Sequence, residues 1–306
     1  MRKTIAVLLV AASVVTCTSP SDQSIRVPSA PSLGRVQDLD GMPDLIVNQQ
    51  KLANSWVIYE ETFSPTSCTV IEGQFKPGTH RTLRFTVSTP NIGTADVFIG
   101  SPLDHMDPNR DGDFSDSDGL YEFADCHQHF HFRNYATYEI FPVDAAGNIT
   151  GAAIQAKKRG FCMIDIDPYN ENEPPGTWVY RSCGSTTRDG FQGISVGYGD
   201  TYFKWLTGQF FLLTDEKEPI RPGRYMIRIT VNPPFARTKK DPCPALDSNG
   251  FCHMFAESNY DNNAAEVVIT VPDRVGKTGW GPGGGKVAQE EIHPGDTKPG
   301  SDKNGN

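Results

Sequence analysis

The chain has 306 residues, of which 37% are hydrophobic, and it carries 28 Lys and Arg against 37 Asp and Glu. This apolar content is enough for one large domain or two small ones, and it gives no sign of membrane spans in the mature protein. The net charge of −9 argues against a nucleic-acid partner and would attract cationic substrates weakly.

The N-terminus has the pattern of an export signal. Met1-Arg2-Lys3 supplies a positive start, and an apolar run over 5–15 precedes Cys17. The run is too short to remain as a membrane-spanning helix. Residues 14–17 resemble a bacterial lipobox, so residues 1–17 are predicted to be a signal peptide that ends either in lipidation of Cys17 or in ordinary cleavage. Both routes predict an exported protein, periplasmic, extracellular or on the cell surface, with membrane contact only through a lipid anchor.

Two segments predict little ordered structure. Residues 18–40 are rich in Ser, Pro, Asp and Gln without an apolar period, which is typical of a disordered linker. Residues 275–306 contain a glycine-rich run and a charged end, which predict a disordered tail. The folded domain is therefore expected at 41–274.

Short β-branched and aromatic runs recur in this domain between clusters of Pro, Gly, Asn and Asp, as expected of strands. The predicted strands are 44–48, 56–62, 82–88, 95–99, 136–142, 177–180, 225–231 and 265–271. The run 224–231 alternates polar and apolar residues, as a half-buried strand does. Helical periodicity is almost absent, so the predicted fold is mainly β: a single β-sandwich-like domain with long loops and little helix.

An acidic segment follows the fourth predicted strand. Residues 107–118 match the calcium-loop pattern D-x-[DN]-x-[DN]-G with an Asp at the twelfth position. No helical pattern flanks the segment, so a true EF-hand is not expected. The candidate ligands of a calcium ion in this segment are Asp107, Asn109, Asp111, Asp113 and Asp118. The alternative is a solvated acidic loop.

Six cysteines remain after the signal, and an even number in an exported protein predicts three disulfides. Cys243 and Cys252 are close in the sequence and are expected to close a local loop. The spacing leaves three ways of joining the other four, which are Cys68, Cys126, Cys162 and Cys183.

Three histidines lie within five residues of sequence. His127, His129 and His131 occupy positions i, i+2 and i+4, which in an extended strand project from one face. Three neutral imidazoles that converge suit Cu(II) or Zn(II) and leave positions for water or substrate. The spacing predicts a metal site but does not separate copper from zinc.

The segment 126–131 resembles the copper-binding stretch of the lysyl oxidase family, in which three alternating histidines follow a cysteine. The segment 158–162, Lys-Arg-Gly-Phe-Cys, resembles the one whose lysine forms lysine tyrosylquinone, and 200–202, Asp-Thr-Tyr, resembles the one that supplies the tyrosine. Segments 222–225 and 231–233 resemble the strand that follows. The resemblance covers about 43–271, with the motifs in the family's order.

The resemblance implies Cu(II) at the three histidines and a quinone cofactor made from Lys158 and Tyr202. It implies oxidative deamination of primary amines, peptidyl lysine or others, to aldehydes, with release of ammonia and hydrogen peroxide. The expected partners are molecular oxygen and a primary-amine or lysine-containing protein substrate. Asp200 is a candidate general base because it lies two residues before Tyr202; alternatively, it holds a turn.

Two further segments resemble those that hold a structural calcium ion in lysyl oxidase-like enzymes. The candidate ligands are Asp44, Leu45, Glu257, Asn259, Asn262 and Asn263. Asn259 replaces an acidic residue of the family, which lowers the ligand charge and predicts weaker binding. The alternative is an Asx-rich turn.

The resemblance also implies two disulfides, Cys68 with Cys126 and Cys162 with Cys183. The alternative joins Cys126 with Cys183 and Cys68 with Cys162.

Two other functions fit parts of the pattern. A non-catalytic surface module that binds copper and calcium predicts no quinone absorbance and no peroxide. A zinc hydrolase suits three histidines, but it leaves the placement of Lys158 and Tyr202 unexplained.

Overall fold

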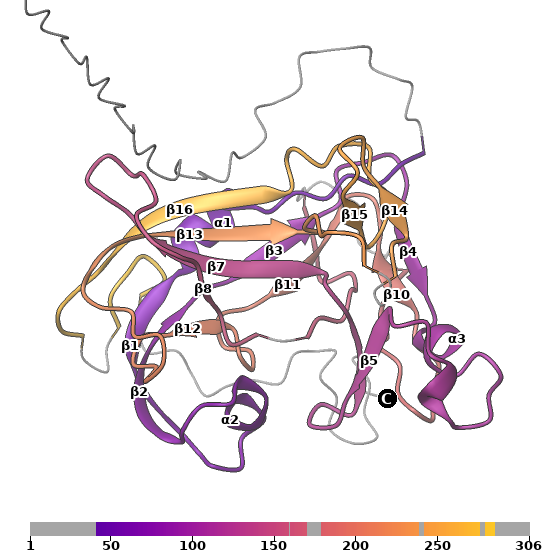
Figure 1. Ribbon diagram of the computed structural model, residues 1–306, viewed down its shortest axis with the longest axis horizontal. Helices are drawn as coiled ribbons and strands as arrows, with labels where there is room; N and C mark the ends of the chain where they lie inside the picture. The colour runs from indigo at the N-terminus through magenta and orange to yellow at the C-terminus, as the bar shows by residue number, and fades with distance from the viewer. Residues whose placement is uncertain (1–40, 159, 170–178, 239–241, 276–278, 285–306) are drawn as a thin grey trace, which may run out of the picture. The chain divides into compact units, whose positions relative to one another are not determined.

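Strands dominate the described part of the chain, which in this computed structural model comprises residues 41–158, 160–169, 179–238, 242–275 and 279–284 (Figure 1). These residues belong to one compact unit that begins at Asp38. The predicted signal, Cys17, the linker 18–40 and most of the tail lie outside the described residues. Within them, no helix combines the length and apolarity that a membrane span needs.

The elements are short and many. The helices are α1 (Gln49–Ser55), α2 (Cys68–Gly73), α3 (Pro102–Met106) and the 3₁₀ helix η1 (Phe114–Asp116). The strands are β1 (Val57–Phe63), β2 (Gly78–Arg84), β3 (Val87–Pro90), β4 (Val97–Gly100), β5 (Tyr121–Ala124), β6 (His129–Phe132), β7 (Ala136–Pro142), β8 (Ile154–Gln155), β9 (Asp167–Pro168), β10 (Gln192–Ile194), β11 (Tyr198–Tyr202), β12 (Phe210–Leu212), β13 (Gly223–Val231), β14 (Ala245–Leu246), β15 (Cys252–His253) and β16 (Ala264–Val271).

Three sheets surround the main hydrophobic core. Their strand orders are β16-β13-β7-β8, β1-β2-β12 and β3-β11-β9, and Figure 1 shows the long strands of the first sheet running side by side. The buried positions of β13 alternate along the strand, so Tyr225, Ile227, Ile229 and Val231 face the core. One hydrophobic cluster contains residues of all three sheets. The prediction of a mainly β domain with little helix is thus confirmed.

Three strand predictions need correction. The predicted strand 82–88 is two strands, because the chain leaves β1 after Arg84 and pairs with β11 from Val87 onward. The segment 44–48 forms only an isolated bridge between Leu45 and Asn91. Val179 and Tyr180 are in no strand, and the start of that predicted strand lies outside the described residues.

The helices have no more than seven residues each. Two turns or fewer cannot display a helical period, which is why the sequence pattern did not reveal them. The side chain of Ser67 begins α2 by accepting a hydrogen bond from the amide of Val70. Helix α2 therefore has a local signal, an N-cap serine, despite its length.

Candidate copper and cofactor site

The histidines lie at the start of the second strand of the β5–β6 hairpin. His129 and His131 are in β6, as predicted, but His127 is in the preceding turn. The carbonyl of Ala124 accepts hydrogen bonds from the amides of His127 and Gln128, and Gln128 has a φ of 60°. The expectation of three histidines in one strand is therefore wrong for His127, because the hairpin must reverse there.

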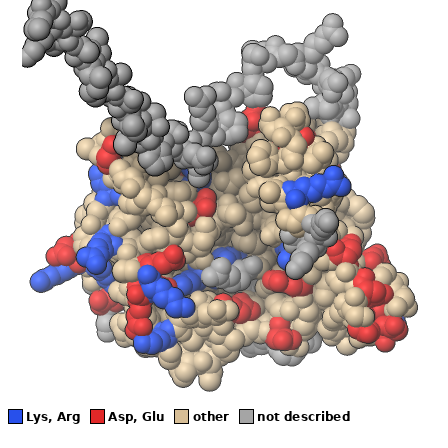
Figure 2. Space-filling view, viewed as in Figure 1, with Lys and Arg blue, Asp and Glu red and all other residues tan. Residues whose placement is uncertain are grey.

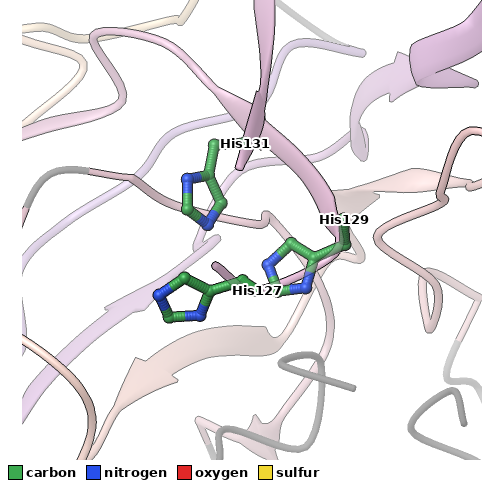
Figure 3. Close-up of side chains that lie close together, drawn as sticks. All are labelled: His127, His129 and His131. Atoms are coloured by element: carbon green, nitrogen blue, oxygen red, sulfur yellow. The ribbon is translucent and has the colours of Figure 1, made fainter. Parts of the chain in front are cut away.

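The turn nevertheless brings all three rings together (Figure 3). The ring centroids are 4.9 to 5.6 Å apart, and one nitrogen from each ring lies within 4.8 Å of the others. Ligation at about 2 Å needs nitrogens no more than about 4 Å apart, so small ring movements suffice for one shared metal ion. All three side chains are buried, and within the described ranges no other set of three or more His, Cys, Asp or Glu converges in this way. The residues therefore fit a copper or zinc ion.

Two contacts that sequence reasoning missed hold these rings. The carboxylate of Glu72 lies 2.9 Å from Nε2 of His127. The backbone of Gly160 lies against His131, so closely that a Cβ at position 160 would be 1.8 Å from Nδ1 of His131. Gly160 belongs to the segment that carries Lys158, so its missing side chain lets that segment touch His131, a candidate metal ligand.

Two disulfides lie next to the site. The structure pairs Cys68 with Cys126, directly before His127, and Cys162 with Cys183. These are the pairs that the resemblance implies, and the alternative pairing is wrong. The third disulfide, Cys243 with Cys252, closes the local loop expected from their spacing.

The two adjacent lysines have different surroundings. Nζ of Lys158 lies 5.1 Å from the ring centroid of Tyr202 and 5.8 Å from that of Phe161. Nζ of Lys157 instead pairs with Asp215 at 2.6 Å. The structure thus brings Lys158, rather than its neighbour, to Tyr202.

Tyr202 is almost fully buried at the end of β11. Its hydroxyl donates to the carbonyl of Cys162 at 3.0 Å and accepts the Cys162 amide hydrogen at 2.8 Å, and Phe161 packs edge-on against the ring. Burial raises the pKa of Tyr202 well above 10.0, and the nearby charge of Asp200 raises it further. The phenol is therefore held neutral and in a fixed orientation.

Asp200 lies on the same face of β11 as Tyr202, two residues earlier, and is fully buried. Its charge also raises the pKa values of Tyr135 and Tyr138, after the larger effect of their burial. The expectation that Asp200 might instead hold a turn is wrong, because the residue pairs with Thr89 of β3 in the sheet. Asp200 therefore stands among three buried tyrosines.

Two hollows lie near these residues. A cavity of about 160 Å³ adjoins Lys158 and is lined by Asn134, Thr137, Tyr138, Gln155, Phe161 and two alanines. A larger groove of about 900 Å³ runs past Lys157 between the end of α2 and the segment 212–218. Only the smaller one borders the lysine that contacts Tyr202.

The two segments predicted to share a structural calcium ion, one around Asp44 and one around Glu257, also meet. Glu257 is buried, and its carboxylate accepts hydrogen bonds from the amide of Leu45 and from the side chains of Asn232 and Asn263. The side chain of Asn262 donates to Asp44 at 2.9 Å. Asn259 is exposed and caps its own turn through the amide of Asp261. Five of the six predicted residues thus come together, and Asn259 does not join them.

The acidic loop is at the molecular surface. Figure 2 shows Asp and Glu gathered at the lower right, where Figure 1 places α3 and the loop after it. The oxygens of Asp107, Asn109, Asp111, Asp113 and Asp118 accept hydrogen bonds from backbone amides two to five residues further along. Helix α3 ends directly before the loop, and its five residues are too few to show a helical period in the sequence. A calcium ion in this loop stays a prediction.

Sequence comparisons with known proteins point to the same family as the motifs. The chain matches the lysyl oxidase family over residues 43–242. It is 25% identical to lysyl oxidase homolog 4 of Homo sapiens over 219 residues, which is 68% of this chain and 25% of that protein. It is 24% identical to protein-lysine 6-oxidase of Gallus gallus over 66% of this chain and 43% of that protein, and 30% identical to lysyl oxidase homolog 1 of Homo sapiens over 52% and 22%.

The alignments thus span less than half the length of these relatives. The family match nevertheless covers well over half of this chain and includes the three histidines, Lys158 and Tyr202. The chain belongs to the lysyl oxidase family.

Proposed function

We propose that the chain is a copper-dependent amine oxidase of the protein-lysine 6-oxidase type. The reaction converts a primary amine, water and oxygen into an aldehyde, ammonia and hydrogen peroxide. Its cofactor is a lysine tyrosylquinone that the protein makes from Lys158 and Tyr202. The relatives named lysyl oxidase or protein-lysine 6-oxidase support this assignment.

One observation carries the proposal: the ammonium group of Lys158 lies 5.1 Å from the ring centroid of Tyr202, although 44 residues of sequence separate them. The same segment of chain touches the metal cluster, because Gly160 lies against His131. A surface lysine and a packed tyrosine have no need of this arrangement beside three converging histidines.

The chain's own residues have separate tasks in this proposal. His127, His129 and His131 hold Cu(II), which supplies the redox chemistry with oxygen that turns the phenol into a quinone. The backbone of Cys162 fixes the phenol of Tyr202 through two hydrogen bonds, so the ring faces Lys158 in one orientation. Asp200 is the proposed general base, a buried carboxylate on the same face of the strand.

The cavity beside Lys158 is the proposed place for the substrate's amine. Its described lining has no acidic residue and no cation other than Lys158 itself. Asn134, Thr137 and Gln155 give this lining hydrogen-bonding groups for an amine, and a monoamine, a polyamine or the side chain of a peptidyl lysine would suit it. The three disulfides suit an exported protein, which agrees with the signal predicted at 1–17.

The decisive experiment is peptide mass spectrometry on copper-loaded protein matured in air. We expect a crosslink between the peptides of Lys158 and Tyr202 with the mass of the quinone. Lys158→Ala should lack it, whereas the matched control Lys157→Ala should retain it, because Lys157 faces Asp215.

Copper binding without any crosslink would contradict the amine oxidase and favour the non-catalytic copper and calcium module. Hydrolytic activity restored by zinc, with the crosslink absent, would favour the zinc hydrolase. Substrate choice would then be measured by peroxide release from a monoamine, a polyamine and a lysine-containing peptide.

A further inference from the structure

Helix α2 is attached to the histidine segment at two points. Its first residue, Cys68, forms the disulfide with Cys126, and Glu72 contacts the ring of His127. Cys68 and Glu72 are four residues apart, so they lie on the same helical face, one turn from each other. The covalent bond therefore presents the Glu72 side of the helix to the histidine that follows Cys126.

The contact between Glu72 and His127 is short and largely shielded from water. Oε2 of Glu72 lies 2.9 Å from Nε2 of His127. The His127 side chain is 4% exposed and that of Glu72 is 24% exposed. An interaction at the edge of a buried cluster is screened less than one on the open surface. Among the described residues, the hydrogen bond that the structure gives to the Glu72 carboxylate is this one.

A carboxylate on one nitrogen of an imidazole determines what the other nitrogen does. When a carboxylate accepts the Nε2–H, the proton stays on Nε2 and the lone pair is on Nδ1. Such carboxylates also fix the ring plane and increase the basicity of the ligand nitrogen. Among the three histidines, His127 depends most on such a contact, because it lies in the turn. His129 and His131 are in β6, where pairing with β5 holds the backbone.

We propose that Glu72 is a positioning residue for His127: it holds the ring by accepting the Nε2–H, so that Nδ1 is presented to the metal. The disulfide Cys68–Cys126 aligns α2 for this task. The inference rests on the proposed copper site, but it does not depend on the quinone or on amine oxidation.

The test is the affinity of the full-length, metal-free protein for Cu(II), measured without oxygen by competition with a chelator. Glu72→Ala should weaken Cu(II) binding by about 10- to 100-fold, which is typical for loss of such a partner. Glu72→Gln should retain most of the affinity, because its amide oxygen accepts the same hydrogen bond. Glu60→Gln, a glutamate of β1 outside the site, is the matched control and should equal the parent.

A second readout separates positioning from folding. The electron paramagnetic resonance spectrum of bound Cu(II) should change in Glu72→Ala, while the unfolding temperature of the metal-free protein stays near that of the parent. The inference is overturned if Glu72→Ala binds Cu(II) with the parent's affinity and spectrum. It is also overturned if Ala and Gln lower the metal-free unfolding temperature equally and leave the spectrum unchanged.

These outcomes are distinct from a failure of the proposed function. A parent that binds no Cu(II) contradicts the copper site and this inference together. A parent that binds Cu(II) but forms no crosslink contradicts only the amine oxidase, and the comparison of Glu72 variants remains decisive.

Discussion

The histidine cluster and the acidic loop 107–118 are both dense in metal-ligand residues, but their side chains are used differently. In the cluster, three rings turn inward to a common point and are buried. In the loop, the carboxylates and the amide oxygen of Asn109 turn back to their own backbone amides, and most of the residues are exposed. The difference lies in how much the rest of the fold holds these side chains in place.

The support comes from parts of the chain that are distant in sequence. Cys68, Glu72 and Gly160 reach the histidines from two other segments, whereas the candidate ligand oxygens of the loop bond mainly to amides of the loop itself. A long-range contact of the loop, between Arg110 and Asp189, is an exposed ion pair. A preorganised ligand set has already lost its conformational entropy during folding, so less is lost when metal binds. We therefore expect changes around the histidines to have larger effects than changes elsewhere.

The largest effect is expected for Gly160→Ala. A Cβ would meet the ring of His131 at 1.8 Å, so either the ring or the segment 158–162 must move. We expect Cu(II) affinity to fall by more than about 100-fold, because a ligand is displaced rather than merely loosened. Competition with a chelator measures it. Gly147→Ala is the control: its φ of 90° strains any side chain although a Cβ meets nothing within 4 Å, so this variant should lose stability but keep the parent's Cu(II) affinity.

Removing the disulfide beside Tyr202 should have the next largest effect. The bridge between Cys162 and Cys183 spans 21 residues, so the double serine variant should lower the free energy of unfolding by about 3 kcal/mol. Denaturant unfolding gives this value. The yield of the Lys158–Tyr202 crosslink should fall as well, since Cys162 orients Tyr202. Serine variants of Cys243 and Cys252 should lose stability but keep the crosslink; equal crosslink losses in both pairs would contradict a local role.

Glu257, in one of the two predicted calcium-binding segments, should make the stability of the metal-free protein depend on pH. Burial raises the pKa of Glu257 from 4.5 to about 7. Because the folded value exceeds the unfolded one, its contribution is fully present below about pH 4.5 and is lost as the pH rises through 7, a decrease of up to about 3 kcal/mol. Thermal unfolding at several pH values should show it, and Glu257→Gln should flatten the profile.

Added Ca²⁺ should restore the stability that is lost as the pH rises, if the segments around Asp44 and Glu257 form a calcium site. A bound ion favours the ionised carboxylate, so added Ca²⁺ should raise the unfolding temperature more at pH 8 than at pH 5. No stabilisation at either pH would leave the Asx-rich turn as the better description of these residues.

The smallest effect is expected for the pair of Lys157 and Asp215. Burial alone would raise the pKa of Asp215, but hydrogen bonds from Lys157 and nearby backbone amides outweigh it and lower the pKa below 3.8. This contribution is present above pH 3.8 and is lost as the pH falls through the folded value. Lys157→Met should cost roughly 1 kcal/mol near neutral pH and little in acid. A loss of crosslink in this variant would contradict the separate roles of the two lysines.

Several parts of this protein were determined by local patterns in the sequence. Alternation along 224–231 predicted β13, and the spacing of the histidines predicted a cluster that the structure brings together. The order of motifs identified the family, and with it Lys158 and Tyr202. Such features are predictable because side-chain periodicity and ligand type are properties of neighbouring residues.

Other parts were decided only by the tertiary structure. The division of 82–88 into two strands and the contacts of Glu72 and Gly160 all depend on segments that are distant from one another in the sequence. A glutamate in a short helix and a glycine in a loop have many ordinary uses, so neither residue type signals a role by itself. Their functions arise because folding places one beside His127 and the other against His131, and long-range packing of this kind is not encoded in any local period.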